Sequence, residues 1–288
     1  MPTGRAFARA ALAGNPSDGY GGAVLAMCVP ELAARAAASA APEALSDPPS
    51  ALVDAAIGRF GRGPCAGRWS TTVPREVGLG GSSAIVTATV RALCALHDHP
   101  LAPDELAEMV LAVEVEDLGL AAGPQDRYAQ AHEGLVLMDF AGARPRVEPL
   151  DPVRLPALYL AWRSGAAEAS HAVHGGLRER GGEPRVRAGM QRLAEHARAA
   201  AAALRDGDHG AFARALDASF DERAALLDLD PRHEAMVNAA RAAGASANYA
   251  GSGGAIVGTL PPDGLGPVAR ALRALDCEVM TPRLRTDD

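Results

Sequence analysis

The feature that most constrains the fold of this chain is the side-chain-poor stretch GLGGSSA at residues 78–84. Apolar side chains recur at helical spacing over residues 85–96, so the stretch predicts a loop at the start of a helix. The first N–H groups of a helix lack partners inside the helix and carry partial positive charge. Glycines let these groups approach an anion closely, which makes a phosphate cradle the first interpretation.

Two other interpretations of this stretch stay open at this point. It is an ordinary tight turn if Ser82 or Ser83 merely caps the helix. It also approaches the strand-turn-helix elbow of α/β-hydrolases, in which a serine is the nucleophile. That reaction needs a histidine from a late loop, and the regular strand-helix alternation of a hydrolase is missing. The histidines available for it are His132, His171, His174, His196, His209 and His233.

The composition excludes several kinds of active site. The chain contains no lysine, so all 28 of its basic side chains are arginine. This excludes the Walker phosphate loop, the strand lysine of protein kinases and a pyridoxal Schiff base. The net charge of −7, without any basic cluster, argues against nucleic acid or an anionic membrane as partner. A small molecule is therefore the expected partner.

The N-terminal segment and the cysteines indicate a cytoplasmic protein. The chain opens without a signal-peptide pattern, and no later stretch has about 20 uncharged apolar residues. The four cysteines form no C-x-x-C pair, which predicts reduced, structural thiols. His97 and His99 are expected on an exposed loop without a metal. Neither HEGLV nor HEAMV completes the H-E-x-x-H zinc motif.

Apolar runs and turn signals predict an α+β order of elements. The first half is expected to have strands at 5–13, 22–29, 67–74 and 134–140, helices at 31–41, 50–60, 82–96 and 103–118, and a loop at 119–130. The second half is expected to have strands at 155–162, 246–260 (two strands around a glycine turn) and 277–284, and helices at 185–205, 208–228, 231–243 and 266–275. The proline-rich segment 145–156 predicts a boundary between domains 1–152 and 153–288.

Three glycine-containing motifs occur in an order that resembles one enzyme family. They are RAALAGNPSD at residues 9–18, PREVGLGGSSA at residues 74–84 and AGSGGA at residues 250–255. The chain resembles the GHMP kinases, which act on galactose, homoserine, mevalonate and phosphomevalonate and have a non-Walker phosphate loop. The central motif is one residue longer than in most members. This longer form, GPQDR at 123–127 and GLVLMDF at 134–140 resemble the glucuronokinase-like sugar kinases.

The resemblance implies a fold and a nucleotide site. The N-terminal domain would be similar to domain 2 of ribosomal protein S5, with a left-handed βαβ crossover, and the C-terminal domain would be ferredoxin-like. The cofactors implied are ATP and Mg²⁺. The residues implied for the nucleotide are Pro74, Gly78, Leu79, Gly80, Gly81, Ser82, Ser83 and Ala84. Ser83 and Glu114 would carry Mg²⁺, with Glu116 as the alternative acid.

The resemblance also assigns the catalytic residues. Asp126, expected in the loop after the second helix of this region, matches the catalytic base of the family. Arg9 matches the basic residue of the first motif, and it would stabilise the ionised carboxylate and the transferred phosphoryl group. Members often have lysine there. Because an arginine does not lose its proton, Arg9 is limited to an electrostatic and hydrogen-bonding role.

The acceptor is expected to be a polyol. Asn15, Ser17 and Asp18 are suited to hydrogen-bond a sugar, although the same residue types also favour a simple turn. The third motif resembles a turn that closes over the phosphates, and it contributes Gly251, Ser252 and Gly253 to the substrate site. Arg127 and Arg163 are available for a uronate carboxylate.

The function implied is an ATP- and Mg²⁺-dependent kinase that phosphorylates the anomeric hydroxyl of a free sugar, with D-glucuronate as the expected acceptor. Two alternatives remain. One is a related kinase for another sugar, mevalonate or homoserine, and the other is a non-catalytic nucleotide or sugar sensor on the same fold. No oligomeric state is assigned.

Overall fold

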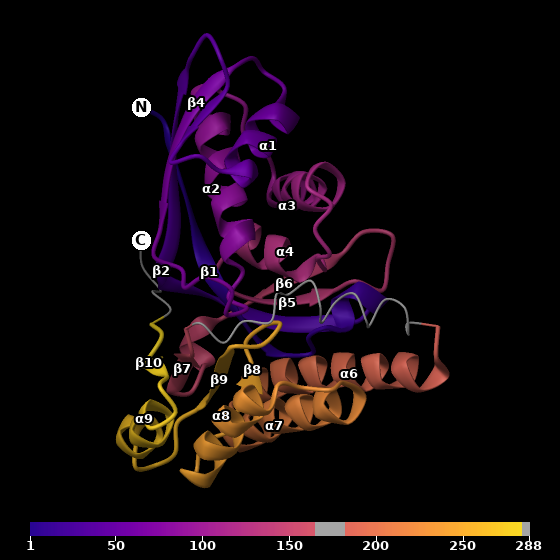
Figure 1. The fold of residues 1–288 in the computed structure, drawn as a ribbon. Coiled ribbons are helices and arrows are strands. Elements are labelled where there is room, and N and C mark those ends of the chain that lie inside the picture. Colours follow the sequence, from indigo (N-terminus) through magenta and orange to yellow (C-terminus); the bar gives the residue numbers. More distant parts are fainter. Residues whose placement is uncertain (165–181, 284–288) are drawn as a thin grey trace.

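The computed structural model describes residues 1–164 and 182–283. The protein is built around two sheets (Figure 1). The strands of the larger sheet are β1 (Thr3–Ala13), β2 (Ala23–Ala40), β3 (Leu45–Asp47), β4 (Cys65–Thr71), β5 (Leu135–Asp139) and β6 (Arg146–Leu150). Those of the smaller sheet are β7 (Leu158–Trp162), β8 (Asn248–Tyr249), β9 (Ala255–Thr259) and β10 (Glu278–Met280).

The helices fall into two groups along the chain. The first group is α1 (Ala51–Phe60), α2 (Gly81–Leu96), α3 (Pro103–Ala112) and α4 (Gln125–His132). The second is α6 (Pro184–Asp206), α7 (His209–Leu226), α8 (Pro231–Ala242) and α9 (Leu265–Arg273). Short turns occur at η1 (Ser17–Tyr20), η2 (Val113–Asp117) and η3 (Pro152–Arg154). Figure 1 shows the first group on one side of the larger sheet and α6 to α8 below it.

Strand β2 is the strand of the larger sheet that pairs with three others. Its first part pairs with β5 and its last part pairs with β4, while β1 runs antiparallel along its other edge. All but the last of residues 31–41, predicted as a helix, belong to this strand. The helical prediction was wrong because alanine is a strong helix former, and pairing with β1 and β4 on both sides overrides that preference.

Both faces of β1 and β2 are buried, but in different cores. Val24 and Ala26 pack with α1 to α4, whereas Leu25 and Met27 pack with α6, α7 and β9. Successive side chains of a strand point to opposite faces, so this alternation follows directly from the strand period. A third core joins the smaller sheet to α8 and α9. The larger sheet is therefore the layer that the two groups of helices share.

The topology of the second half is ferredoxin-like, as expected. The smaller sheet has the order β10-β7-β9-β8 with antiparallel neighbours, and helices connect β7 to β8 and β9 to β10. In the first half, β3 and β4 are parallel neighbours joined by α1, which is a βαβ unit. The left hand of that crossover stays a prediction.

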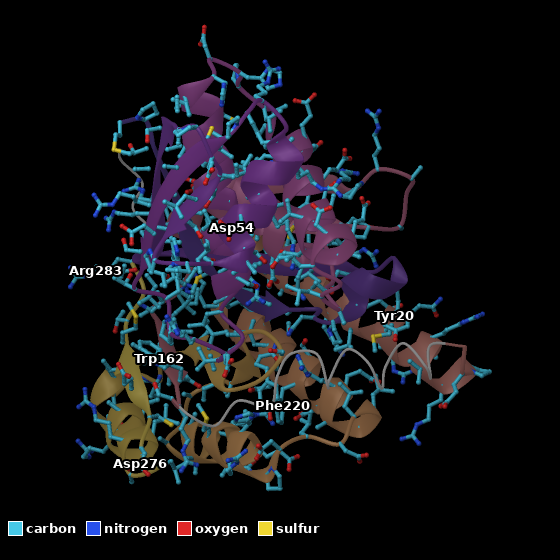
Figure 2. The ribbon with its side chains drawn as sticks, turned by 45° about the horizontal axis from the view of Figure 1, so that its top comes forward. Tyr20, Asp54, Trp162, Phe220, Asp276 and Arg283 are labelled. Carbon is cyan, nitrogen blue, oxygen red and sulfur yellow. The ribbon has the colours of Figure 1, made fainter. Side chains whose placement is uncertain are left out.

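The connection between the halves is shorter than predicted. Residues 146–150 of the proline-rich segment form β6, which pairs with β5, so only residues 151–157 link the two sheets. Figure 2 shows Asp54 among the elements of the first half, in the upper part of the view, and Trp162 and Phe220 among those of the second half below. The C-terminal segment returns to the larger sheet, where the backbone N–H of Arg283 donates to Glu31 at 2.8 Å. The division into domains 1–152 and 153–288 stays a prediction.

Candidate active site

The glycine-rich stretch forms the turn into α2, as the sequence predicts. The N-cap of α2 is Gly80, with a left-handed φ of 70°, and Gly78 has a φ of 75°. Glycine adopts this region without the strain that a Cβ brings. No side chain of the described residues caps this end of α2, so the alternative with Ser82 or Ser83 as cap is wrong. The first N–H groups of α2 thus have no side-chain cap among the described residues, which is the arrangement that an anion can use.

Ser83 is turned away from the helix end and toward an acid. Its hydroxyl donates to the two carboxylate oxygens of Glu114, at 3.2 Å to Oε1 and 3.0 Å to Oε2. Both side chains are fully buried. Glu114 lies in η2, the single π-helical turn that follows α3, a kind of distortion frequent at functional sites. Glu116 instead pairs with Arg59 at 2.8 Å, and its side chain is 66% exposed.

Glu114 also forms a buried ion pair with Arg127 of α4. Nε of Arg127 lies 2.5 Å from Oε2 of Glu114, and a second nitrogen, Nη2, contacts the same oxygen. Nη1 donates to the carbonyl of Gly123 at 2.5 Å. Burial alone lowers the pKa of Arg127, but the adjacent carboxylates, led by Glu114, raise it above its ordinary value. Arg127 therefore serves as the counter-ion of Glu114.

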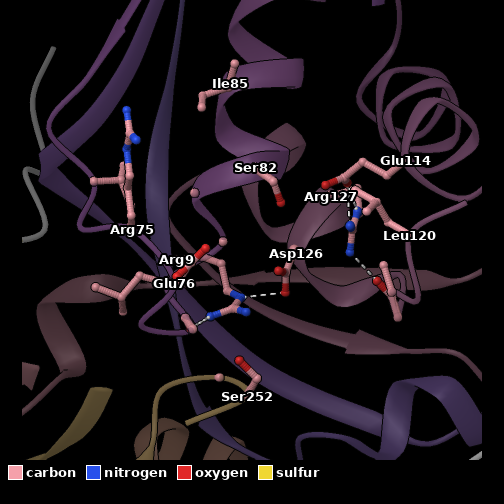
Figure 3. A pocket seen from close by; sticks show the side chains of 18 of the residues that line it. Arg9, Arg75, Glu76, Ser82, Ile85, Glu114, Leu120, Asp126, Arg127 and Ser252 are labelled. Carbon is pink, nitrogen blue, oxygen red and sulfur yellow. Dashed lines mark hydrogen bonds and ion pairs between the residues drawn. The ribbon is translucent and has the colours of Figure 1, made fainter. Parts of the chain in front are cut away.

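Asp126 and Arg9 form the central ion pair of the site (Figure 3). Nε of Arg9 lies 2.6 Å from Oδ1 of Asp126, and their side chains are 4% and 16% exposed. Nη1 of Arg9 donates to the carbonyls of Gly78 at 2.6 Å and Ala250 at 2.7 Å. The guanidinium is thereby fixed by groups from three separate parts of the chain.

Asp126 does not lie in a loop, contrary to prediction. It is the second residue of α4, whose N-cap is Pro124. A carboxylate in the first turn of a helix is favoured by the partial positive charge there. Gln130, one turn further along α4, donates to the carbonyls of Phe7 at 2.9 Å and Gly80 at 2.8 Å. The sequence reading missed Gln130, which fixes the glycine turn against β1, because it missed this helix.

The three residues predicted for the sugar have different environments. Asn15 lines the cavity, and its Nδ2 donates to the carbonyl of Gly251 at 2.9 Å. Its Oδ1 is buried without a hydrogen-bond partner among the described residues. Ser17 donates to the carbonyl of Ala23 at 2.9 Å, and Asp18 accepts two hydrogen bonds from Gln125. Ser17 and Asp18 are not among the described residues that line the cavity.

Asp18 has a strongly perturbed acidity. Burial raises its pKa from 3.8 to about 6, opposed by the hydrogen bond from the backbone of Gln125 and reinforced by Asp126. A raised native pKa means that the folded state holds this proton where the unfolded chain has lost it. The contribution of this proton to the unfolding free energy is therefore fully present below pH 4 and is lost as the pH rises through 6.

We expect Asp18→Asn to remove this pH dependence. Two pKa units correspond to roughly 3 kcal/mol, so the variant should gain up to about that much unfolding free energy relative to wild type at pH 7 and little at pH 4. Gln125 can accommodate the new amide because its Oε1 has no hydrogen-bond partner among the described residues. Urea unfolding at both pH values measures the difference, and a gain that is equal at pH 4 and pH 7 would contradict the assignment.

The glycine turn of the third motif packs against the glycine turn that precedes α2. A Cβ on Gly251 would overlap the carbonyl oxygen of Gly78, so the two glycine turns are in direct backbone contact. Gly251 and Ser252 line the cavity. Gly253, with a φ of 140°, lies beside the ring of His233 instead. The sequence-predicted motifs are thus adjacent in space.

One cavity of about 560 Å³ brings these parts together. Of the predicted nucleotide residues, it is lined by Pro74, Gly78, Leu79, Gly80, Gly81 and Ser82. Ser83 and Ala84 lie behind this wall and are fully buried. An apolar part of the lining is formed by Leu52, Trp69, Val73 and Ile85, and a polar part by Arg9, Asn15, Glu114, Asp126, Arg127 and Arg223. A largely apolar pocket with a few convergent polar groups is typical of a small-molecule site.

The serine-nucleophile alternative gains no support from this cavity. No histidine of the described residues lines it. His132 contacts Asp104 at 2.7 Å, and His209 contacts the carbonyl of Arg154 at 3.1 Å. His171 and His174 lie outside the described residues. A serine without a histidine partner lacks the base that this chemistry needs.

Two further sequence expectations concern metals and membranes. His97 and His99 lie in the connection between α2 and α3, as the sequence predicts, but they are partly buried rather than fully exposed, and His97 lies against Phe60 and Cys65. The described residues contain no group of three His, Cys, Asp or Glu side chains arranged for a metal. Arg163 is 3.8 Å from Asp276 and outside the described cavity lining. None of the described helices combines the length and apolar character required to cross a bilayer.

Comparisons with known proteins agree with this arrangement. Residues 49–134 match the family described as GHMP kinases N terminal domain. Glucuronokinase 1 of Arabidopsis thaliana is 33% identical over 202 residues, which cover 66% of this chain and 55% of that protein. The chain thus spans about half the length of this curated relative.

Solved structures with the same fold cover nearly the whole chain. The phosphomevalonate kinase of Streptococcus pneumoniae in complex with phosphomevalonate and AMPPNP superimposes with a TM-score of 0.84, at 17% identity, over 98% of this chain and 100% of that one. The galactokinase of Lactococcus lactis complexed with galactose gives a TM-score of 0.81, at 14% identity, over 98% and 93%. At this identity the likeness establishes the fold.

Proposed function

Because the chain belongs to the GHMP kinases through its N-terminal domain, we propose that it is an ATP-dependent kinase that phosphorylates the anomeric hydroxyl of a free sugar. The proposed acceptor is D-glucuronate, and the products are the sugar 1-phosphate, ADP and a proton. The identity of 33% with Glucuronokinase 1 supports this choice of acceptor. We place the reaction in the cytoplasm, where ATP is available.

The observation that carries the proposal is the Arg9–Asp126 ion pair in one cavity with the open first turn of α2. In the proposed reaction Asp126 accepts the proton of the acceptor hydroxyl. The hydroxyl oxygen forms a bond to the γ-phosphorus, the bond to the β,γ-bridging oxygen breaks, and that electron pair leaves with ADP. Arg9 holds the Asp126 carboxylate in place through their ion pair and stabilises the charge on the transferred group.

The nucleotide is proposed to lie along the glycine turn. Phosphoryl transfer asks a protein mainly for alignment and charge stabilisation. The backbone N–H groups from Gly78 to Ser83 would hold the phosphates, while Pro74, Leu79 and Ala84 shape the turn. Gly251, Ser252 and Gly253 would close the site from the opposite side. The apolar part of the lining offers a surface for the adenine ring of ATP.

The residues predicted for Mg²⁺ fit that ion chemically. A hydroxyl and a carboxylate lie 3.0–3.2 Å apart, and Mg²⁺ is usually held by one or two such oxygen groups together with substrate phosphates. Arg127 approaches Oε2 of Glu114, so Oε1 and the Ser83 hydroxyl are the proposed ligands. The ion would neutralise charge on the phosphates. Glu116, exposed beside Arg59, is not proposed as a ligand.

A panel of acceptors tests the proposal. We expect ADP release with D-glucuronate at about 1–100 s⁻¹, a range typical of kinases, and a much lower kcat/KM with neutral hexoses, mevalonate and homoserine. Preference for another acceptor would keep the kinase and replace the sugar. ATP binding without turnover on any acceptor would contradict the proposed function and favour the sensor.

A further inference from the structure

Arg223, on α7, is a buried cation in the cavity wall that no sequence motif marks. It is 1% exposed and lines the cavity. Among the described residues three arginines are buried, namely Arg9, Arg127 and Arg223. The first pairs with Asp126 and the second with Glu114. Arg223 forms no ion pair with any carboxylate in residues 1–164 or 182–283.

The neighbours of Arg223 hold its guanidinium without neutralising it. Nη1 donates to the carbonyl of Gly251 at 2.7 Å, and Nη2 donates to the carbonyl of Ser252 at 3.0 Å. Its Nε is buried and has no hydrogen-bond partner among the described residues. The guanidinium carbon lies 5.0 Å from the centre of the Tyr249 ring. Two of its five N–H groups therefore donate to described residues, and for the other three no hydrogen-bond partner is found among the described residues.

An uncompensated buried charge is costly, and a counter-charge in the ligand would relieve that cost. Removing a charged group from water destabilises the protein unless an opposite charge or several hydrogen bonds replace the water. Burial lowers the pKa of Arg223 to about 10; Tyr249 and Asp18 oppose this effect and Arg9 adds to it. The group therefore stays charged at neutral pH. The cavity thus contains a cation in need of an anion.

The position of Arg223 relates it to the acceptor. Its Nη1 and Nδ2 of Asn15 both donate to the same carbonyl, that of Gly251. In the proposed nucleotide site, the first turn of α2 and Arg9 already serve the phosphates. A planar guanidinium with free N–H groups matches the planar carboxylate of a uronate. We infer that Arg223 binds the anionic group of the acceptor, the carboxylate in the case of a uronate, and so selects acidic sugars over neutral ones.

This inference rests on the proposed function for the identity of the acceptor, and the kinetics of Arg223→Gln test it. KM for D-glucuronate should rise about 10- to 100-fold, the effect expected when a charge-assisted hydrogen bond is lost. KM for ATP should change less than about threefold, and kcat/KM for glucose should stay the same or rise. Arg223→Lys keeps the charge but not the planar guanidinium. Its KM for D-glucuronate should lie between those of wild type and Arg223→Gln.

Controls separate binding from folding. Arg192→Gln makes the same change at an exposed arginine that pairs with Glu222 of α7, and it should behave like wild type. The melting temperature of Arg223→Gln with and without AMPPNP reports whether the nucleotide site is intact. A merely structural Arg223 would lower activity on charged and neutral sugars equally, and this result would overturn the inference while the proposed function stands.

Two further outcomes distinguish the sources of the anion. If Arg223→Gln raises KM for ATP and leaves KM for D-glucuronate unchanged, Arg223 binds the nucleotide phosphates and the inference is wrong. If wild type prefers another anionic acceptor and Arg223→Gln loses that preference, the inference holds while glucuronate is replaced. If wild type prefers neutral sugars, both fail.

Discussion

Replacing Asp126 by asparagine is expected to lower kcat by about 10²- to 10⁴-fold, the usual contribution of a general base. Asparagine has nearly the same shape but does not accept the proton of the acceptor hydroxyl. Arg9 keeps its hydrogen bonds to Gly78 and Ala250 in the variant, so the glycine turn should stay in place. ATP affinity, measured by calorimetry, should therefore change by less than about threefold.

A matched variant makes the Asp126 result specific. Asp104 is likewise the second residue of a helix, α3, and its side chain is 57% exposed. Asp104→Asn should leave kcat unchanged, because it alters a first-turn carboxylate that is outside the described cavity lining. Near-normal turnover of Asp126→Asn would refute its role as base. A loss of ATP binding in the same variant would place Asp126 with the nucleotide instead.

The second large effect concerns stability and arises from the Glu114–Arg127 pair. Arg127→Met should lower the unfolding free energy by about 3–5 kcal/mol, because it leaves the fully buried Glu114 carboxylate without its cation. Ser83 supplies only one hydroxyl to that charge. Urea unfolding at pH 7 measures the loss.

The double variant Arg127→Met/Glu114→Gln provides the comparison. Removing both charges removes the unpaired carboxylate, so the double variant should be more stable than Arg127→Met alone. If the double variant is as unstable as the sum of the two single variants, the two side chains do not act as a pair. As a surface reference, Arg68→Met breaks the exposed pair with Asp47 and should cost less than about 1 kcal/mol.

The sequence predicted the glycine turn and its helix because both signals are local. Gly78 and Gly80 lie at positive φ, where the residue type itself is informative, and the apolar spacing of α2 reports its own buried face. The second-half helices α6, α7 and α8 were confirmed for the same reason. Their boundaries follow from proline, aspartate and glycine signals within a few residues.

The errors arose where distant parts of the chain decide the structure. Residues 31–41 are alanine-rich, and only their pairing with β1 and β4 makes them a strand. Gly123 and Pro124 are typical of a continuing loop, yet Pro124 is the N-cap of α4 and Asp126 lies in its first turn. Proline is also common at the start of a helix, and here it marks that start.

The partners of the site residues were beyond prediction for the same reason. Ser83 and Glu114 are 31 residues apart, and Arg223 and Gly251 are 28 apart. No sequence periodicity joins such pairs. Arg127 and Arg163 were the arginines considered for a uronate carboxylate, but one is paired with Glu114 and the other lies near Asp276. Arg223 differs from both because it is buried without an ion pair among the described residues, a combination that only the structure shows.

The hydrogen bond from Arg9 to the carbonyl of Ala250 spans 241 residues of the chain. The backbone of β1 makes a further link there, from the N–H of Ala11 to the same carbonyl at 2.8 Å. Contacts between such distant residues can form only after a long loop of chain has closed. The final position of the Arg9 guanidinium therefore depends on a contact of very high sequence separation.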